Sequence, residues 1–319
     1  MQYIKYFNST INFLFVVIDI DMDKVIKSYI KHICGEDSLE ENVPMSTRTT
    51  FKIGGPAKFF VTVKSKEQLI KLISSLSFAS VPYCVVGGGS NLLVSDEGYD
   101  GVIIKPAFNE VIQNDNFIYA DAGATLAKVV NFATSCGLSG LEFACGIPGT
   151  IGGAVYMNAG AYGSEISDIV TMVDVWDGNK IKSINNKELD FGYRNSIFKK
   201  EKDLVILGVY LYLRKSDKQQ ISTYVRELLL KRINTQPKEP SAGSIFKKPS
   251  PDFYVGKAIE ELDLKGSVIG GAQISNKHAG FIINVNNASS ADVLNLINLV
   301  KEKVLHSYGV ELELEVILI

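Results

Sequence analysis

The chain has 319 residues, of which 46% are hydrophobic and 21% are charged. Both fractions are near the globular average, which argues against disorder. Its 33 basic and 35 acidic side chains give a formal net charge of −2. No excess positive charge is available to bind a phosphate polymer, so we expect no nucleic-acid partner. Because a typical domain has ~100–200 residues, two or three packed units are expected.

The cysteines and histidines exclude two common kinds of site. Cys34, Cys84, Cys136 and Cys145 show no C-x-x-C spacing, so neither a disulfide framework nor a thiolate zinc site is indicated. None of the three histidines lies at metal-ligand spacing from another. We therefore expect no metal, and reduced thiols in the cytoplasm.

An apolar run at Ile11–Ile20 follows Lys5 and superficially resembles the start of a signal peptide. This run is too short to span a bilayer as a helix, and acidic residues follow it instead of a small-x-small cleavage site. We therefore expect neither export nor a membrane anchor. Met22 is an alternative initiator, because a helical apolar pattern begins just after it. Residues 1–41 are expected to form an N-terminal extension that contains this helix.

Residues 42–110 are predicted to form the first globular unit. Phe59–Val63 is typical of a short strand, and Ser65 then caps a helix whose apolar residues recur every three or four positions to Leu76. Pro82–Val86 is typical of a buried strand, and it leads into a glycine turn and the extended run Leu92–Val94. A further strand is expected at 102–105.

Residues 111–215 are predicted to form a second unit. Its expected elements are three strands and one helix: Phe117–Ala122, a helix with Leu126, Val129, Val130 and Ala133 on one face, Val170–Trp176 and Leu204–Leu213. Gly137 is a plausible C-terminal cap of that helix, and Asp177-Gly178-Asn179 is typical of a hairpin turn. Residues 140–163 are too rich in glycine and alanine for a standard helix core.

Residues 216–319 are predicted to form a third, α+β unit. The polar stretch 216–220 marks its start, and an amphipathic helix follows with Val225, Leu228, Leu229 and Ile233. A second helix is expected at Asp292–His306, ended by Gly309, and an alternating strand at Val310–Ile319 closes the chain.

Two glycine clusters are candidates for ligand binding. Gly87-Gly88-Gly89 follows a strand, so its backbone N–H groups suit a pyrophosphate. The G-G-G-S-N spacing differs from G-x-G-x-x-G and leads into an extended run, which argues against a Rossmann domain. In the second cluster, 140–163, Pro148 fixes a turn, while asparagine, threonine and tyrosine supply directional polar groups. That composition suits a flat heterocycle lying against backbone.

Several motifs occur in order along the chain: T-x-F-x-I-G-G-P-A at 49–57, V-G-G-G-S-N at 86–91, G-I-P-G-T-I-G-G-A at 146–154, Y-R-N-S-I-F-K at 193–199, A-G-S-I-F-K-K-P at 242–249, K-H-A-G-F-I-I-N at 277–284, and the closing E-L-E-V. Together they resemble the FAD-binding fold of the vanillyl-alcohol oxidase type. Within that fold they are similar to the UDP-N-acetylenolpyruvoylglucosamine reductase family, over residues 42–316.

The resemblance implies an α+β fold with a two-part FAD-binding domain, 42–110 and 111–215. A C-terminal α+β substrate-binding domain follows, whose last strand returns to the active site. It implies an enzyme that takes a hydride from NADPH onto FAD and reduces the enolpyruvyl ether of a UDP-sugar to UDP-N-acetylmuramate, in bacterial cell-wall synthesis. A cytoplasmic monomer without membrane contact is expected.

The resemblance also implies the cofactor-binding residues. The first glycine loop would hold the FAD pyrophosphate, and the second cluster would line the ring system. The residues implied are Val86, Gly87, Gly88, Gly89, Ser90, Asn91, Gly146, Ile147, Pro148, Gly149, Thr150, Gly153, Asn158, Ala159 and Gly160.

Three residues are candidates for catalysis. Reduction of an enolpyruvyl group needs a cation for the carboxylate, and the guanidinium of Arg194 suits it. By resemblance, Ser244 donates the proton. Without the resemblance, the simpler interpretation of Arg194 is a surface arginine, and that of the segment around Ser244 is a flexible polar loop. Periodicity cannot choose among three C-terminal glutamates, but isoleucines follow Glu315 on its own face, so a raised pKa is expected there. The resemblance also selects Glu315.

Substrate contacts are implied for Lys247, Lys248 and Gln273. Lys248 stands where many relatives carry asparagine, and Ile317 where a basic residue is common, so details of substrate binding differ here. The chain is placed in the branch without an extra tyrosine-bearing loop. Two alternatives remain: a flavin oxidase of the same fold, and a nucleotide-binding module without catalysis. No histidine lies between His32 and His278 to tether FAD in the first units.

Overall fold

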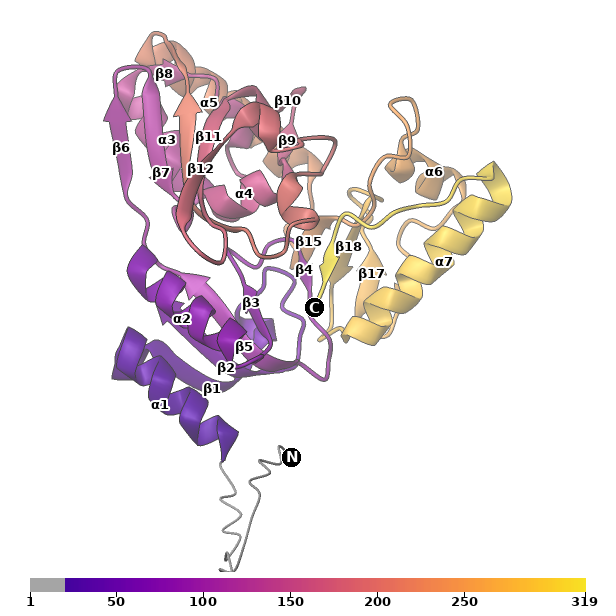
Figure 1. Ribbon diagram of the computed structural model, residues 1–319. Helices are drawn as coiled ribbons and strands as arrows, with labels where there is room; N and C mark the ends of the chain where they lie inside the picture. The colour runs from indigo at the N-terminus through magenta and orange to yellow at the C-terminus, as the bar shows by residue number, and fades with distance from the viewer. Residues whose placement is uncertain (1–20) are drawn as a thin grey trace, which may run out of the picture.

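The computed structural model describes residues 21–319. The apolar run at 11–20 and the question of an exported leader lie outside the described residues. Three units are visible: two stacked at one side of the molecule, and a third, containing α6 and α7, beside them (Figure 1). Within residues 21–319 no helix combines the length and apolar character needed to cross a membrane.

The first unit is a four-stranded sheet in the order β1-β2-β5-β3. The strands are β1 Leu39–Pro44, β2 Pro56–Val63, β5 Tyr99–Pro106 and β3 Tyr83–Val85. Helices α1 (Met22–Cys34) and α2 (Lys66–Phe78) pack together against it, and Ser65 caps α2 through the N–H of Gln68, as its sequence predicts. Ile30 of α1 is fully buried. Helix α1 and β1 are therefore integral to this unit, unlike the separate extension expected for 1–41.

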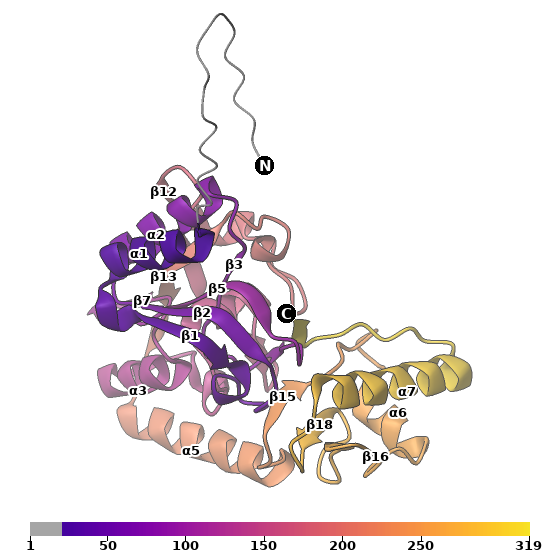
Figure 2. The ribbon, with the colours of Figure 1, turned by 90° about the horizontal axis from the view of Figure 1, so that it is seen from below.

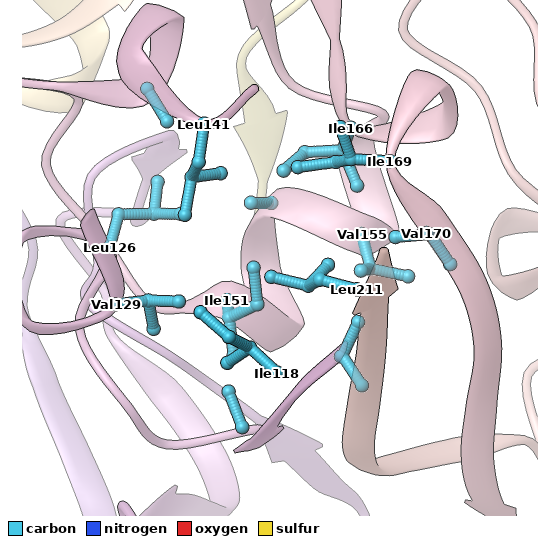
Figure 3. Packing of buried hydrophobic residues seen from close by; sticks show 14 of the residues in the cluster. Ile118, Leu126, Val129, Leu141, Ile151, Val155, Ile166, Ile169, Val170 and Leu211 are labelled. Carbon is cyan, nitrogen blue, oxygen red and sulfur yellow. The ribbon is translucent and has the colours of Figure 1, made fainter. Parts of the chain in front are cut away.

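The second unit is an antiparallel sheet in the order β12-β11-β13-β7-β6. The strands are β6 Val111–Asn114, β7 Phe117–Asp121, β11 Val170–Trp176, β12 Ile181–Asn185 and β13 Val205–Tyr212. Helix α3 (Leu126–Cys136) ends at Gly137 in the left-handed conformation, as its sequence predicts. Apolar side chains from α3, α4 and the sheet meet in one core (Figure 3).

The expectation that 140–163 holds no standard helix is wrong for part of the segment, because α4 spans Ile151–Met157. Ile151 and Val155 are fully buried. A side chain at Gly152 would lie 3.0 Å from the Cβ and carbonyl oxygen of Ala122, so glycine lets this helix rest directly on the chain after β7. Burial in a core overrides the weak helix propensity of glycine here.

Helix α5 (Lys218–Thr235) also belongs with the second unit. It contacts α3, the 3₁₀ helix η3 (Glu142–Ala144) and β8 (Leu138–Ser139), and Leu228 joins their core. Figure 2 shows α5 running alongside α3. The polar stretch at 216–220 therefore marks the start of a helix and not a change of unit. The chain crosses to the third unit only after Thr235.

The third unit is a four-stranded sheet in the order β15-β18-β17-β16, with helices α6 (Val255–Glu261) and α7 (Ser290–Tyr308). Its strands are β15 Ser241–Ser244, β16 Val268–Ile269, β17 Ala272–Ile274 and β18 Phe281–Asn284. Helix α7 begins at a capping box of Ser289 and Asp292 and ends at Gly309. Its buried apolar residues are Val293, Leu296, Ile297, Val300 and Val304.

The C-terminal segment does not form the strand expected over 310–319. Only β19, Ile317–Leu318, pairs with a neighbour, and that neighbour is β4, Leu92–Leu93, in parallel. A single bridge joins Leu314 to Phe246. The segment therefore leaves the third unit and ends against the first, beside the first glycine loop (Figures 1 and 2).

The remaining elements are short. They are β8 Leu138–Ser139, β9 Gly160–Ala161, β10 Ser164–Glu165 and β14 Arg214–Lys215, with the 3₁₀ helices η1 Glu36–Ser38, η2 Met45–Thr47, η4 Ile166–Asp168, η5 Asn186–Glu188 and η6 Ile197–Lys199.

Candidate active site

A cavity of about 1470 Å³ lies where the three units meet. Residues 87–91, 146–150 and 159–161 contribute to its lining, as do Arg194, Ser244 and Glu315. Typical ligand pockets measure ~300–1,000 Å³, so this cavity has room for more than one small molecule. The structure thus brings both glycine clusters and all three candidate catalytic residues to one space.

The two glycine clusters touch each other. A Cβ added at Gly88 would lie 2.7 Å from the Cα of Gly149, and the hydroxyl of Ser90 donates to the carbonyl of Pro148 at 2.8 Å. These loops belong to the first and second units, so their contact also joins the units. Only glycine permits this approach at Gly88, because real Cβ atoms do not come so close to backbone.

The first loop fits a pyrophosphate. Within the described part of the chain, the backbone N–H groups of residues 87–91 have no hydrogen-bond partner. Consecutive free amides in a turn form an anion-binding concavity. Adjacent backbone polar groups are normally paired, so an unpaired row facing a cavity is a fitting site for the phosphates of FAD.

The polar side chains of the predicted cofactor set hold the loops in place. Thr150 caps α4 by accepting from the N–H of Gly153. The amide of Asn91 donates to the carbonyl of Glu315 at 3.0 Å, which ties the C-terminal segment to the first loop. Asn158 is fully buried and away from the cavity lining; its amide donates to the carbonyl of Gly192 and accepts from the N–H of Ser167. Backbone groups of residues 87–91 and 146–150 therefore remain available to a ligand in the cavity.

Arg194 and Glu315 form a partly buried ion pair. Arg194 Nε donates to Glu315 Oε1 at 2.7 Å, with the side chains 17% and 16% exposed. Nη2 of Arg194 donates to the carbonyl of Gly160 at 2.9 Å, and Nη1 to that of Asn158 at 3.4 Å. Three hydrogen bonds to two separate segments, 158–160 and Glu315, therefore fix the direction of the guanidinium.

Burial raises the pKa of the Glu315 carboxyl, as the sequence predicts. The ion pair with Arg194 and the nearby Lys199 and Lys247 oppose this rise in pKa but do not cancel it. Glu313, two residues earlier, is exposed, and its ion pair with Lys247 lowers its pKa. The surroundings in the fold therefore distinguish Glu315 from Glu313 by opposite shifts in pKa, a distinction that sequence periodicity could not make.

Ser244 ends β15 and lines the cavity. Gly243 before it adopts φ 80°, and Ile245 after it donates to the carbonyl of Gly280 at 3.0 Å. The hydroxyl of Ser244 has no hydrogen-bond partner among residues 21–319. Rigid backbone therefore presents a free hydroxyl to the ligand space.

The three residues expected to contact substrate do not line this cavity. Lys247 pairs with Glu313 at 3.0 Å, and the Lys248 ammonium lies 4.4 Å from the centre of the Tyr254 ring. Gln273 donates to the carbonyl of Gly266 at 3.1 Å. None of the three therefore lines the cavity with Arg194 and Ser244, although Lys247 lies close enough to Glu315 to oppose the rise in its pKa.

Basic residues at the cavity were missed by the sequence reasoning. Lys52, Lys202, Arg232 and Lys238 all contribute to its lining. Arg232 lies on α5, where its Nη1 donates to Gln236 at 2.9 Å and its guanidinium carbon lies 5.9 Å from the centre of the Tyr162 ring. Four cations around one cavity suit anionic ligands. The sequence L-L-L-K-R-I at 228–233, in which Arg232 interrupts an apolar helix face, could have indicated that this arginine binds a ligand.

The contact between the glycine loops predicts that Gly88→Ala loses flavin. The new Cβ would push the loop containing Gly149 away and disturb the row of free amides. We expect the ratio of flavin to protein absorbance after purification to fall at least about tenfold, as for loss of a ligand-binding loop. Gly256→Ala in α6 is the control, since its nearest neighbour would be 3.4 Å away. Equal flavin content in both variants would contradict the assignment of the loop.

Comparisons with known proteins agree with this geometry. The FAD binding domain family matches residues 57–180, and the UDP-N-acetylenolpyruvoylglucosamine reductase C-terminal domain family matches residues 236–319. The UDP-N-acetylenolpyruvoylglucosamine reductase of Pseudothermotoga lettingae is 45% identical over 274 residues, 86% of this chain and 95% of that protein. The enzyme of Caldanaerobacter subterraneus subsp. tengcongensis is 45% identical over 298 residues, 92% of this chain and 98% of that protein.

A solved structure is also similar. The crystal structure of UDP-N-acetylenolpyruvylglucosamine reductase from Thermus caldophilus superposes with a TM-score of 0.74 at 38% identity, covering 86% of this chain and 97% of that chain. The α+β fold and the FAD-binding region define a FAD-dependent oxidoreductase. More narrowly, the chain belongs to the UDP-N-acetylenolpyruvoylglucosamine reductase family, as its motifs imply.

Proposed function

We propose that Arg194, Ser244 and Glu315 carry the chemistry of the reaction that this family catalyses. That reaction is the NADPH-dependent reduction of UDP-N-acetylglucosamine enolpyruvate to UDP-N-acetylmuramate, with FAD as cofactor, in peptidoglycan synthesis. The observation that carries the assignment is the convergence of these three side chains, from three parts of the chain, on one glycine-lined cavity.

FAD, when bound, accepts a hydride from NADPH and supplies it to the substrate double bond. The free amides of residues 87–91 would hold its phosphates. The second cluster, around Gly146–Thr150 and Ala159–Gly160, would lie against its ring system, since its backbone lines the same cavity. The roles of the individual cofactor residues are part of this proposal.

Arg194 has donors left for the substrate carboxylate. A guanidinium carries five N–H donors, and single bonds from Nε, Nη1 and Nη2 go to the protein. One N–H therefore remains on each terminal nitrogen for hydrogen bonds to the substrate carboxylate. The ion pair with Glu315 holds these donors in one orientation, and negative charge that builds on the carboxylate during reduction is stabilised there.

Ser244 completes the reaction by proton transfer. Hydride addition converts the substrate methylene carbon to a methyl group and leaves an electron pair on the neighbouring carbon, which bears the carboxylate. The Ser244 hydroxyl gives its proton to that carbon, and solvent returns a proton to the serine. A hydroxyl is a weak acid, yet a carbanion-like carbon is a strong enough base to take its proton.

The same proposal extends to the setting of the enzyme. The four cysteines are free thiols, which supports the reducing cytoplasm as its location. We place the FAD-binding region at 22–235 and the substrate-binding region at 236–319, because α5 packs with the second unit. A monomer without nucleic-acid or membrane partners stays a prediction.

Arg194→Lys tests the carboxylate-binding role. Lysine offers a point charge without a fork and cannot contact both Glu315 and Gly160. We expect the KM for the enolpyruvyl UDP-sugar to rise roughly 10–100-fold, with flavin reduction by NADPH unchanged. Arg226→Lys, at an exposed position on α5, is the control. An unchanged KM in Arg194→Lys would contradict the role.

A further inference from the structure

Arg194 occupies a backbone conformation that side chains rarely adopt. Residues 192–195 form a tight turn in which the N–H of Gly192 donates to the carbonyl of Asn195 and the reverse bond is also made. Arg194 stands at the third position of this turn with φ 53°. Glycine or asparagine normally fills such a position, and another residue there needs support from its surroundings.

Lys199 supplies that support. Its ammonium donates to the backbone carbonyl of Arg194 at 2.7 Å, the only hydrogen bond of this ammonium within residues 21–319. The bond closes the short loop between the turn and the 3₁₀ helix η6. A lysine five residues after the arginine therefore holds the peptide unit whose orientation sets where the guanidinium leaves the backbone.

The segment that carries Lys199 is held by its buried neighbours. Ser196 is fully buried and donates to the carbonyl of Tyr156 at 2.7 Å, and Phe198 is 3% exposed. The Lys199 ammonium lies 5.9 Å from the centre of the Tyr156 ring, and Tyr156 lines the cavity. The partly buried lysine thus lies against Tyr156 of α4.

Charge also connects Lys199 to the site. Burial lowers the pKa of its ammonium, and the cations of Lys247 and Arg194 lower it further, while Glu315 opposes them. Arg194 and Lys199 thus both face the Glu315 carboxylate, while Lys247 is paired with Glu313. This excess of positive charge favours the approach of a carboxylate-bearing substrate to Arg194.

We propose that Lys199 is a positioning residue that locks the Arg194 turn, and through it aims the guanidinium at the substrate carboxylate. The inference rests on the proposed function of Arg194. Lys199 acts on the backbone of Arg194 and contacts no reacting atom. Its loss leaves the guanidinium itself unchanged but loosens the backbone turn from which the Arg194 side chain extends.

Lys199→Met provides the first test, because methionine keeps the length of the side chain and removes the ammonium. In stopped-flow measurements we expect the NADPH half-reaction to be unchanged. Reoxidation of the reduced flavin by the enolpyruvyl UDP-sugar should slow about 10–100-fold, with a matching rise in KM. Lys199→Arg, which keeps a cation, should recover much of this loss. Lys200→Met is the control, since Lys200 is exposed and, within residues 21–319, pairs only with Asp190.

A double-mutant cycle separates positioning from direct binding. If Lys199 acts through Arg194, Lys199→Met added to Arg194→Ala slows reoxidation no further. Additive losses would overturn the proposal, because Lys199 would then bind substrate on its own. No slowing in Arg194→Ala alone would overturn the role of Arg194 and this inference together. If Lys199→Met does not fold, the pair Lys199→Gln and Lys199→Arg serves in its place, and equal rates in that pair overturn the proposal.

Discussion

Ser244→Ala is expected to block the second half of the reaction, the reoxidation of the reduced flavin, and to leave the first half, flavin reduction, intact. Flavin reduction by NADPH should proceed at the native rate, because within residues 21–319 the hydroxyl makes no hydrogen bond to either loop that would hold the cofactor. Reoxidation by the enolpyruvyl UDP-sugar should slow roughly 10²–10⁴-fold, the usual contribution of a positioned proton donor. Single-turnover absorbance of the flavin, with each half-reaction started separately, measures both rates.

Ser244→Cys is the matched variant for this experiment. A thiol keeps a transferable proton at nearly the same place, so this variant should lose less than Ser244→Ala. Native reoxidation in Ser244→Ala would remove the residue from the mechanism. A loss of equal size in both variants would indicate that the hydroxyl acts by shape and not by proton transfer.

Glu315→Gln is expected to have the second largest effect. The amide cannot form the 2.7 Å ion pair with Arg194 Nε, which leaves that partly buried cation without its partner. We expect reoxidation to slow roughly 10²–10³-fold, as for loss of a group that fixes charge stabilisation, with little change in NADPH-driven reduction. Glu311→Gln, an exposed position on the same segment, is the control.

The raised pKa of Glu315 adds a pH dependence to this prediction. In the native enzyme the ion pair with Arg194 needs the carboxylate, so the reoxidation rate should fall as pH drops through a pKa that lies above 4.5. Glu315→Gln has no carboxyl to titrate at this position, so its reoxidation rate should not show this fall at low pH, the acidic limb of the pH–rate profile. The same limb in both proteins would assign it to another group and contradict the role of Glu315.

Capping residues and amphipathic periods in the sequence predicted where several helices begin and end. Ser65 before a 3.6-residue apolar period located α2, and Gly137 and Gly309 located the ends of α3 and α7. Capping and amphipathicity are properties of neighbouring residues, so they can be read from sequence. The motifs around Gly87 and Gly146 likewise predicted a FAD-binding region, and the family match confirms it.

Features that depend on distant partners could not be read in this way. Arg194 and Glu315 are 121 residues apart in the chain, and only folding brings them to 2.7 Å. Helix α4 forms from glycine-rich sequence because the surrounding core is closed around Ile151. The C-terminal alternation suggested a long strand, but the segment makes only one isolated bridge, Leu314 to Phe246, and a two-residue strand, Ile317–Leu318, paired with β4. Lys199 ends the Y-R-N-S-I-F-K motif, but no role could be predicted for it, because its partner is a backbone carbonyl, which no side-chain pattern reveals.

The most direct test of the account is the steady-state oxidation of NADPH by the native, FAD-loaded protein with and without UDP-N-acetylglucosamine enolpyruvate. The account predicts that NADPH oxidation depends on the enolpyruvyl substrate and forms one UDP-N-acetylmuramate for each NADPH consumed. NADPH oxidation at the same rate without the substrate, or consumption without that product, would contradict it.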